Sequence, residues 1–537
     1  MTSQTPTSAR WWRDAVIYQV YVRSFADGDG DGIGDLRGIR DRLDHFSDLG
    51  VDALWLTPFY TSPMADGGYD VADYRGVDPM FGDLAEFAAL ITDAHHRGLR
   101  VIVDVVPNHS SSAHVWFQDA LRGAPEARAR YIFRPGRGER GELPPNDWES
   151  IFKGPAWTRE TTASGEPGDW YLHLFDSTQP DLDWENSEVR AEFEDILRFW
   201  LDLGVDGFRI DVAHGMIKAE GLPDVGTAGR GNMLDTADLP YFDQDGVHEI
   251  YRAWRKILDS YPGERIGVAE AWAPTAHRLS LYIRPDELHQ AFNFEYVAAQ
   301  WSTEDFRRVV DESLDTVAEV GAPATWVLSN HDIQRHVTRY GGGERGLRRA
   351  RAAALLTLAL PGCAYVYQGE ELGLPEVLDL PDEALQDPMW ERSGRTERGR
   401  DGCRVPIPWS GGEPPFGFGP EGTVAWLPQP AVWAGLTAAA QRADERSVLA
   451  LYRGALRLRK ELPALGDGEL TWLDGPPGVL VFAREPGFLC TVNFGDCAVP
   501  ISVPGEAVLC SDPDASLTGE TVSLPGECAV WWRSAGT

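Results

Sequence analysis

The sequence predicts an α/β fold, a (β/α)8 TIM barrel with an inserted subdomain after its third strand and an all-β domain at its C-terminus. Apolar β-forming runs alternate with amphipathic helical stretches, the runs number eight, and the pattern changes to short strands near the C-terminus. Eight parallel strands are the number that closes such a barrel. The runs are residues 16–25, 53–58, 100–106, 207–213, 265–272, 290–296, 325–332 and 363–368.

Helices are predicted between these runs from caps and periodicity. Asp83 can cap a helix over residues 84–96, with Glu86 completing a capping box and Gly98 ending it. A second helix is predicted over residues 188–203, where apolar side chains recur on one face. Helices of this kind between the runs can cover the outside of the barrel.

Three connections are far longer than an ordinary βα loop. Residues 108–184 are rich in Gly, Pro, Trp and Arg and are predicted to form a subdomain, while residues 216–246 and 376–419 should wall a pocket at the C-terminal edge of the barrel. The predicted domains are residues 1–108 (first part of the barrel), 109–184 (inserted subdomain), 185–463 (remainder of the barrel) and 464–537 (C-terminal β domain).

The charge balance argues against two classes of partner. The chain has 49 Lys and Arg against 83 Asp and Glu, a formal net charge of -34, which repels phosphate backbones and anionic lipids. The sequence shows neither an export signal nor a run of about 18 apolar residues. Its six cysteines form no CxxC pair, so we expect reduced thiols and a cytoplasmic location, with no nucleic acid or membrane partner.

Three acidic residues stand at the ends of barrel strands. Asp211 closes the fourth run, Glu270 the fifth and Asp332 the seventh, so barrel closure brings them to one mouth. Cleavage of a glycosidic bond with retention of configuration requires two carboxyl groups roughly 5 to 5.5 Å apart. Acids at the ends of neighbouring strands suit that spacing.

The neighbours of two of these acids predict different roles for them. Arg209 lies on the same face of its strand as Asp211, and a guanidinium lowers the pKa of a nearby carboxyl group, which suits a nucleophile. Glu270 has apolar neighbours that would raise its pKa, which suits a general acid/base. We therefore predict Asp211 as the nucleophile and Glu270 as the acid/base.

Five segments resemble the signature regions of glycoside hydrolase family 13, the α-amylase superfamily. They are DVVPNH (104–109), QPDLDW (179–184), GFRIDVAHG (207–215), EAW (270–272) and SNHD (329–332), in the family's order. The resemblance implies Asp211 as nucleophile, Glu270 as acid/base and Asp332 as transition-state stabiliser. It also implies that His109, Arg209 and His331 bind hydroxyl groups of the cleaved sugar.

Two further segments resemble the exo-acting α-glucosidase and oligo-1,6-glucosidase branch of that family. They are Gly67-Gly68-Tyr69-Asp70 and the loop that contains Arg400. The resemblance implies that Tyr69 stacks on the terminal glucose, while Asp70 and Arg400 pair and bind its distant hydroxyls. Such a closed pocket admits only the non-reducing end of a short α-glucoside.

The preferred linkage and the acceptor stay open at this point. Val212 and QPDLDW resemble enzymes that cleave α-1,6 bonds, whereas the rest of Val212-Ala213-His214-Gly215 departs from them, and maltose-type substrates are weakly favoured. An oligo-1,6-glucosidase is the alternative, as is a glucosyltransferase or sugar isomerase that passes the covalent glucosyl group on Asp211 to a sugar. The retained acids argue against a noncatalytic family member. The sequence leaves the oligomeric state open.

The acidic loop at residues 27–35 predicts a structural metal. Its carboxylates alternate with glycine, which supplies oxygen ligands on a pliable backbone. It resembles the calcium or magnesium loop of oligo-1,6-glucosidase-like members, which implies the side chains of Asp27, Asp29, Asp31 and Asp35 and the carbonyl of Ile33 as ligands. No organic cofactor is expected, because no strand, GxGxxG and helix unit occurs.

Overall fold

A barrel of eight parallel strands forms the centre of the computed structural model, which describes residues 10–162, 164–226, 239–502, 505–517, 519 and 521–534. The strands follow the order β10-β11-β1-β2-β3-β7-β8-β9. They are β1 (Val16–Val20), β2 (Ala53–Leu56), β3 (Arg100–Val105), β7 (Gly207–Ile210), β8 (Ile266–Ala269), β9 (Gln290–Ala291), β10 (Thr325–Val327) and β11 (Cys363–Tyr367).

All eight predicted runs contain a barrel strand, so the predicted fold class is confirmed. The strands are shorter than the runs, because the last residues of each run leave the sheet and enter the loops at its C-terminal edge. The two end strands, β9 and β10, are joined by a side chain: Thr325 Oγ1 donates a hydrogen bond of 2.6 Å to the carbonyl of Ala291. The barrel is thus closed except for a seam between these two strands.

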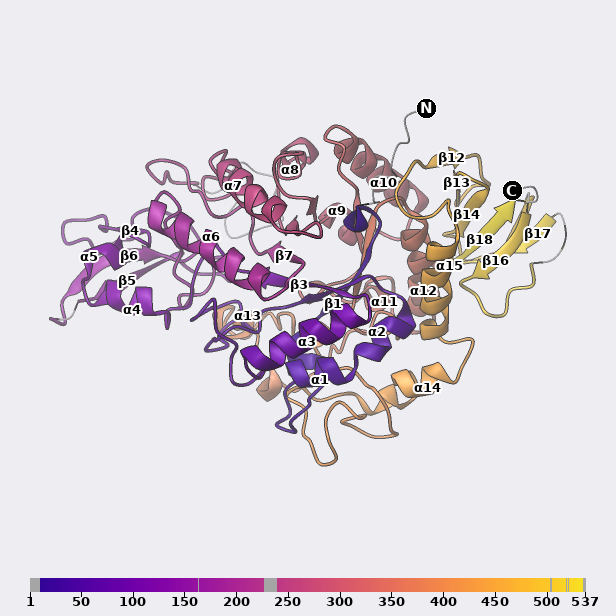
Figure 1. Cartoon of the computed structure of the whole chain (residues 1–537), viewed down its shortest axis with the longest axis horizontal. Coiled ribbons are helices and arrows are strands. Elements are labelled where there is room, and N and C mark those ends of the chain that lie inside the picture. The colour runs from indigo at the N-terminus through magenta and orange to yellow at the C-terminus, as the bar shows by residue number, and fades with distance from the viewer. Residues whose placement is uncertain are drawn as a thin grey trace.

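Helices surround the barrel, as Figure 1 shows. Asp83 caps α3 (Leu84–His96) by accepting from the amides of Ala85 and Glu86, which confirms the predicted cap. The predicted helix 188–203 is α6 (Ser187–Asp202). The other helices are α1 (Leu36–Asp41), α2 (Leu43–Leu49), α7 (Val247–Ser260), α8 (Ala276–Leu281), α9 (Phe294–Ala298), α10 (Thr303–Ala318), α11 (His336–Arg339), α12 (Gly343–Ala359), α13 (Pro388–Arg392), α14 (Ala438–Arg442) and α15 (Val448–Glu461).

The segment inserted after β3 has its own small sheet and core. Helices α4 (Val115–Leu121) and α5 (Pro125–Arg128) precede a sheet of order β4-β6-β5, made by β4 (Phe133–Arg134), β5 (Trp157–Thr161) and β6 (Pro167–Leu172). Figure 1 places these elements at the end of the molecule opposite the C-terminus. Residues 227–238 of the long connection 216–246 lie outside the described residues.

The C-terminal strands pack against α12 and α10. They form a five-stranded sheet of order β12-β13-β14-β18-β16 and a pair β15-β17. The strands are β12 (Thr471–Leu473), β13 (Val479–Arg484), β14 (Phe488–Asn493), β15 (Val499–Ser502), β16 (Gly505–Cys510), β17 (Thr521–Leu524) and β18 (Cys528–Ser534). Glu527 anchors this region, because its carboxylate accepts from Arg345, Arg348 and Arg349 of α12 at 2.6 to 2.9 Å.

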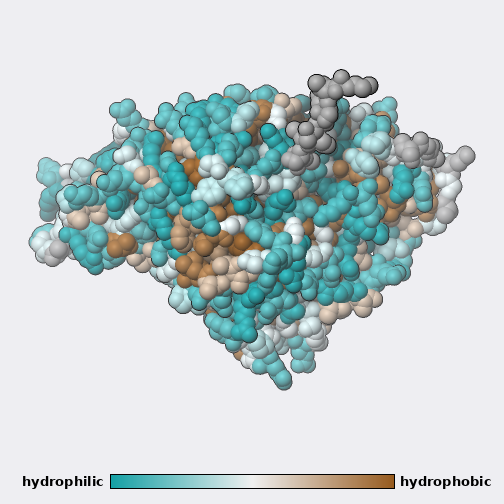
Figure 2. All heavy atoms as spheres, viewed as in Figure 1, coloured by the Kyte–Doolittle hydropathy of each residue, from teal (hydrophilic) through white to brown (hydrophobic). Residues whose placement is uncertain are grey.

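The surface is mainly hydrophilic in the view of Figure 2, in which apolar residues gather near the middle of the face. Among the residues that the structure describes, no helix combines the length and apolar character needed to cross a bilayer.

Candidate active site

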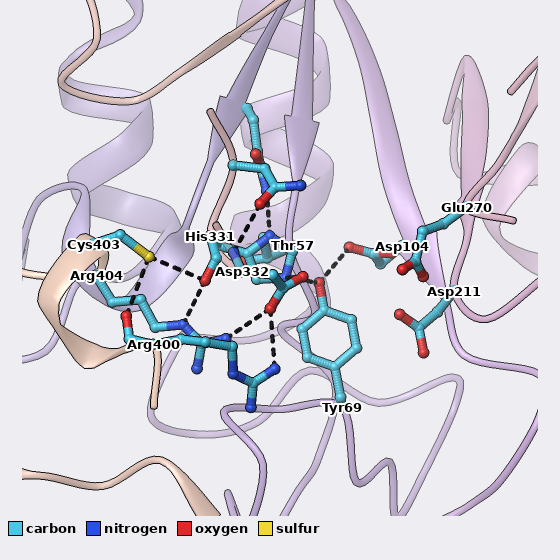
Figure 3. A network of polar contacts seen from close by, with 12 residues as sticks. Thr57, Tyr69, Asp104, Asp211, Glu270, His331, Asp332, Arg400, Cys403 and Arg404 are labelled. Carbon is cyan, nitrogen blue, oxygen red and sulfur yellow. Dashed lines mark hydrogen bonds and ion pairs between the residues drawn. The ribbon is translucent and has the colours of Figure 1, made fainter. Parts of the chain in front are cut away.

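A cavity of about 530 Å³ opens at the C-terminal edge of the barrel, between the barrel loops and the inserted segment. Most of the predicted catalytic and substrate-binding residues line it, with the exception of Asp70 and Arg209. Its walls include Asp66, Tyr69, His109, Phe152, Phe175, Asp211, Val212, Glu270, Trp272, Phe294, His331, Asp332 and Arg400. Figure 3 shows that Asp211 and Glu270 lie close together on one side, with Tyr69 between them and the Asp332 and Arg400 side.

One buried arginine connects the acids of three neighbouring strands. Arg209 Nη1 lies 2.6 Å from Asp104 Oδ1 and 2.7 Å from Asp211 Oδ1, and its Nη2 lies 2.9 Å from Glu270 Oε2. Asp104 and Arg209 are register partners on β3 and β7, which explains their contact. The barrel register therefore brings Asp211 and Glu270 together through a shared cation.

The electrostatics of this pair agree with the prediction for Glu270 and differ from it for Asp211. Burial raises the pKa of Asp211 well above its usual value and also raises the pKa of Glu270, and Arg209 opposes both shifts. The prediction that Arg209 would hold the pKa of Asp211 low was wrong, because burial outweighs the guanidinium. Since Arg209 also contacts Glu270, it does not distinguish the two carboxyl groups.

The surroundings do distinguish them by hydrogen bonding. Glu270 Oε2 accepts from the backbone amide of Val212 at 2.9 Å, and its Oε1 accepts from Trp272 Nε1 at 3.3 Å. Trp272 in turn stacks on Phe294, with ring centroids 3.5 Å apart and an interplanar angle of 13°. The carboxyl group of Glu270 is thus oriented at both of its oxygens.

Asp332 belongs to a second polar cluster across the cavity. His331 Nε2 lies 3.2 Å from Asp332 Oδ2 and 2.7 Å from the hydroxyl of Tyr69, and its Nδ1 lies 2.6 Å from Gln19 Nε2. Burial lowers the pKa of His331 well below its usual value, so the ring is neutral. Burial alone would raise the pKa of Asp332, but the guanidinium groups of Arg400 and Arg404, each 3.0 Å from its Oδ1, outweigh burial and hold that pKa well below its usual value.

Arg400 pairs with other aspartates than the predicted one. Its Nη2 lies 2.7 Å from Asp66 Oδ1, its Nη1 lies 3.0 Å from Asp332 Oδ1, and its Nε lies 2.5 Å from Asp387 Oδ2. Asp70 instead accepts from the amides of residues 65 and 66 and from the Ser62 hydroxyl. The prediction that Asp70 and Arg400 pair was therefore wrong. Asp70 is buried and accepts hydrogen bonds within its own loop, whereas Asp66 lines the cavity.

His109 lies where the barrel meets the inserted segment. Its Nε2 is 3.2 Å from the carbonyl of Tyr69 and 3.2 Å from Gln179 Nε2. Burial lowers the pKa of His109 to about 4, so the ring is neutral at pH 7. A neutral ring can both donate to and accept from a sugar hydroxyl.

The polar residues of the site that escaped the sequence analysis include Asp66, Asp104, Asp387 and Arg404. Asp104 opens the first signature segment and contacts Arg209, Tyr69 and Trp55. A signal for Asp66 existed, since it flanks Gly67-Gly68-Tyr69 on the other side from Asp70. Asp387 and Arg404 gave no such signal, because they reach the site only through the folding of the long loop after β11.

Part of the predicted metal loop converges. Asp27, Asp29 and Asp35 each place a carboxylate oxygen within 4.8 Å of the others. Burial raises the pKa of Asp35 to about 6, and its acidic neighbours add to the rise. Asp31 Oδ1 accepts from the amide of Ile33, so the structure gives Asp31 a role within the loop backbone. Three hard oxygen donors on a partly buried loop fit a calcium or magnesium ion.

The chain is similar to known enzymes along almost its whole length. The sequence profile of the α-amylase catalytic domain matches residues 19–468. A probable α-glucosidase from Rhizobium meliloti (strain 1021) is 38% identical over 515 residues, which cover 92% of this chain and 91% of that protein. An oligo-1,6-glucosidase from Parageobacillus thermoglucosidasius is 34% identical over 536 residues, 93% of each chain. The crystal structure of an α-glucosyl transfer enzyme is 37% identical, with a TM-score of 0.86 and coverage of 99% of this chain and 100% of that chain.

Proposed function

We propose a function for a chain that belongs to the α-amylase family and is a glycoside hydrolase of its α-glucosidase branch. In this proposal the enzyme is a retaining, exo-acting α-glucosidase that releases glucose from the non-reducing end of short α-glucosides. The observation that carries it is the closure of one side of the cavity by Arg400, which is held by Asp66, Asp332 and Asp387.

The proposed chemistry has two steps. In the first, the carboxylate of Asp211 attacks the anomeric carbon while Glu270 gives its proton to the departing glycosidic oxygen. In the second, water attacks the glucosyl–Asp211 bond and gives a proton to Glu270, which restores both side chains. The third acid, Asp332, remains ionised beside the reacting sugar and stabilises the positive charge that develops on its ring.

The binding roles proposed for the cavity follow from its polar groups. Tyr69, which lines the cavity with its ring stacked on His331, contacts the terminal glucose, while His109 and His331 bind its hydroxyls. Arg209, which the resemblance also implied as a hydroxyl ligand, does not line the cavity and instead holds Asp211 and Glu270. Asp66 and Arg400 bind its distant hydroxyls by charge-assisted hydrogen bonds, in the place first assigned to Asp70. Because this end of the cavity is occupied by an ion-pair cluster, an internal segment of a long glucan cannot pass through.

Maltose-type substrates are weakly favoured, and an oligo-1,6-glucosidase or a glucosyl-transferring enzyme is the alternative. Relatives named for each activity match the chain. All of them fit one covalent intermediate, since the acceptor alone decides whether water or a sugar takes the glucosyl group. Small α-glucosides, rather than nucleic acids or membranes, are the proposed partners, and the six free thiols suit a cytoplasmic location.

We also propose a structural calcium or magnesium ion at Asp27, Asp29 and Asp35. A cation there would offset the mutual repulsion of the three carboxylates and fix their loop, and it has no part in the two chemical steps. Treatment with a chelator should lower the Tm and restoration of either ion should recover it, with kcat at 25 °C nearly unchanged. An unchanged Tm would exclude the ion.

The decisive test follows the products of four sugars. Purified protein is incubated separately with maltose, isomaltose, sucrose and trehalose, with Asp211→Ala as the blank. Release of glucose that the blank lacks would establish the glucosidase and identify its linkage. Isomerised disaccharide without net glucose would identify a transferase, and no turnover of any sugar would refute activity on small glucosides.

A further inference from the structure

Val212, the residue after the proposed nucleophile, has a left-handed backbone conformation, with φ of +44°. A β-branched residue rarely adopts this conformation, which costs about 1 to 3 kcal/mol and persists only where the surrounding structure enforces it. Val212 lies at the C-terminal edge of β7, directly between Asp211 and the long connection that follows. The strained residue therefore lies in the active site itself, beside Asp211.

The left-handed turn directs two successive amides at Glu270. The amide of Val212 donates to Glu270 Oε2 at 2.9 Å, and the amide of Ala213 donates to the carbonyl of Glu270 at 2.8 Å. The turn then closes on itself, because the amide of Gly215 donates to the carbonyl of Val212 at 2.9 Å. Side chain and backbone of Glu270 are thus both held by the segment that follows Asp211.

The side chain of Val212 explains why the strain persists. It is 3% exposed and belongs to the hydrophobic core of the inserted segment rather than to the barrel core. That core also contains Trp148, Phe152, Leu174 and Phe175. Packing against the inserted segment therefore fixes the residue whose amide orients Glu270.

We propose that Val212 is a positioning residue for Glu270: its strained backbone, anchored in the core of the inserted segment, determines which oxygen of the carboxyl group carries the catalytic proton. The inference rests on the acid/base role proposed above for Glu270. Oε2 accepts from the amide of Val212 and lies 2.9 Å from Arg209 Nη2, so both neighbours are donors. Oε1 also has a donor, Trp272 Nε1, but at the longer distance of 3.3 Å, so the proton resides on Oε1, beside the Trp272 and Phe294 stack.

Two variants test this role without removing a catalytic side chain. Val212→Gly keeps the amide but loses the anchor, and glycine adopts the left-handed conformation without strain, so the turn is no longer enforced. Replacement of the amide between Asp211 and Val212 by an ester keeps the anchor but removes the donor. Leu222→Gly is the matched control, because Leu222 also has a positive φ (48°) and packs against the same core, whereas its amide donates to the carbonyl of Ala219.

The readout compares a substrate that needs a proton with one that does not. The kcat/KM of both variants should fall at least about 10-fold on whichever of maltose and isomaltose the wild type cleaves, and less than about 3-fold on α-glucosyl fluoride. The basic limb of the pH profile should move to higher pH in the ester variant, since the lost donor had favoured the ionised carboxylate. Leu222→Gly should change neither.

Equal losses on the disaccharide and the fluoride, or no loss on either, would overturn the positioning role. If Val212→Gly fails to fold, the ester variant decides alone, because it keeps the native side chain. Failure of the proposed function gives a different result, namely a wild type that hydrolyses neither the disaccharides nor the fluoride.

Discussion

At the mouth of the barrel one arginine holds three carboxylates. Where the C-terminal strands meet α12, here called the docking surface, three arginines of α12 hold the one carboxylate of Glu527. Arg209 contacts Asp104, Asp211 and Glu270, all of them buried. Glu527 is equally buried, but Arg345 and Arg348 are about half exposed and only Arg349 is mostly covered. The two clusters use the same chemical groups in inverse proportion.

The difference between the clusters lies in what happens to the unbalanced charge. At the barrel mouth burial outweighs the one shared guanidinium, so the pKa values of Asp104, Asp211 and Glu270 rise. At the docking surface the excess positive charge reaches water, and although burial opposes it, the arginines lower the pKa of Glu527. The cluster at the barrel mouth keeps three acids close together, which should lower the stability of the fold. The cluster around Glu527 joins the C-terminal strands to α12.

Removal of a carboxylate from the barrel mouth should have the largest effect on activity and little or no cost in stability. Asp211→Asn removes the proposed nucleophile and one of three crowded acids, so we expect hydrolysis to fall at least about 1000-fold. The Tm should stay equal or rise, because a buried like charge is relieved. Product analysis and scanning calorimetry on the same preparation check both. A large fall in Tm would show that Asp211 is structural.

Glu527→Gln should give the opposite pattern. It leaves three arginines without their shared partner, and we expect a loss of about 1 to 2 kcal/mol in the free energy of unfolding, moderated by the exposure of two of them. The kcat of the folded protein should not change, because none of the residues in this cluster lines the cavity. Urea unfolding monitored by fluorescence measures the stability, and Arg345→Gln, which removes one exposed partner, should cost less.

The smallest effect, and the sharpest test of the comparison, is pH dependence. Burial raises the pKa of Asp104 to about 6, so its favourable contribution to stability is present at low pH and is lost as pH rises through about 4 to 6. The pKa of Glu527 is lowered, so its contribution is present above about pH 4.5 and is lost as pH falls. The two clusters should therefore respond to pH with opposite sign.

Two variants separate these contributions. The stability of Asp104→Asn relative to the wild type should increase between pH 4 and 6, whereas the deficit of Glu527→Gln should shrink below about pH 4.5. Urea unfolding from pH 3.5 to 7 measures both differences. Slopes of the same sign would refute the contrast between the clusters.

The barrel was predictable because its strands are short apolar runs with a fixed spacing to amphipathic helices, a pattern that local sequence carries. The strand-end acids followed, since closure of parallel strands brings their C-terminal ends together. The choice between Asp66 and Asp70 did not follow, because both flank the same Gly-Gly-Tyr segment and only the path of the loop decides which one faces the cavity.

The electrostatic roles were predicted less well for a physical reason. The sequence showed Arg209 two residues from Asp211, but it did not show that Nη2 reaches across to Glu270, nor how much burial outweighs either contact. The left-handed conformation of Val212 was equally invisible, because valine normally avoids it and tertiary packing alone imposes it. Local patterns therefore identified the reacting groups but not the devices that orient them.

Because β9 and β10 are not paired in the sheet, the barrel has two ends that meet at a seam. The barrel should deform most easily at this seam, where the side-chain hydrogen bond from Thr325 to Ala291 replaces the backbone hydrogen bonds that join the other strands. Trp272 and Phe294 follow the two strands on one side of that seam, and Trp272 donates to Glu270. A shift of the strands at this seam would therefore change the orientation of Glu270. Substitutions at Thr325, on β10 at the other side of the seam, would alter turnover although Thr325 does not contact the sugar.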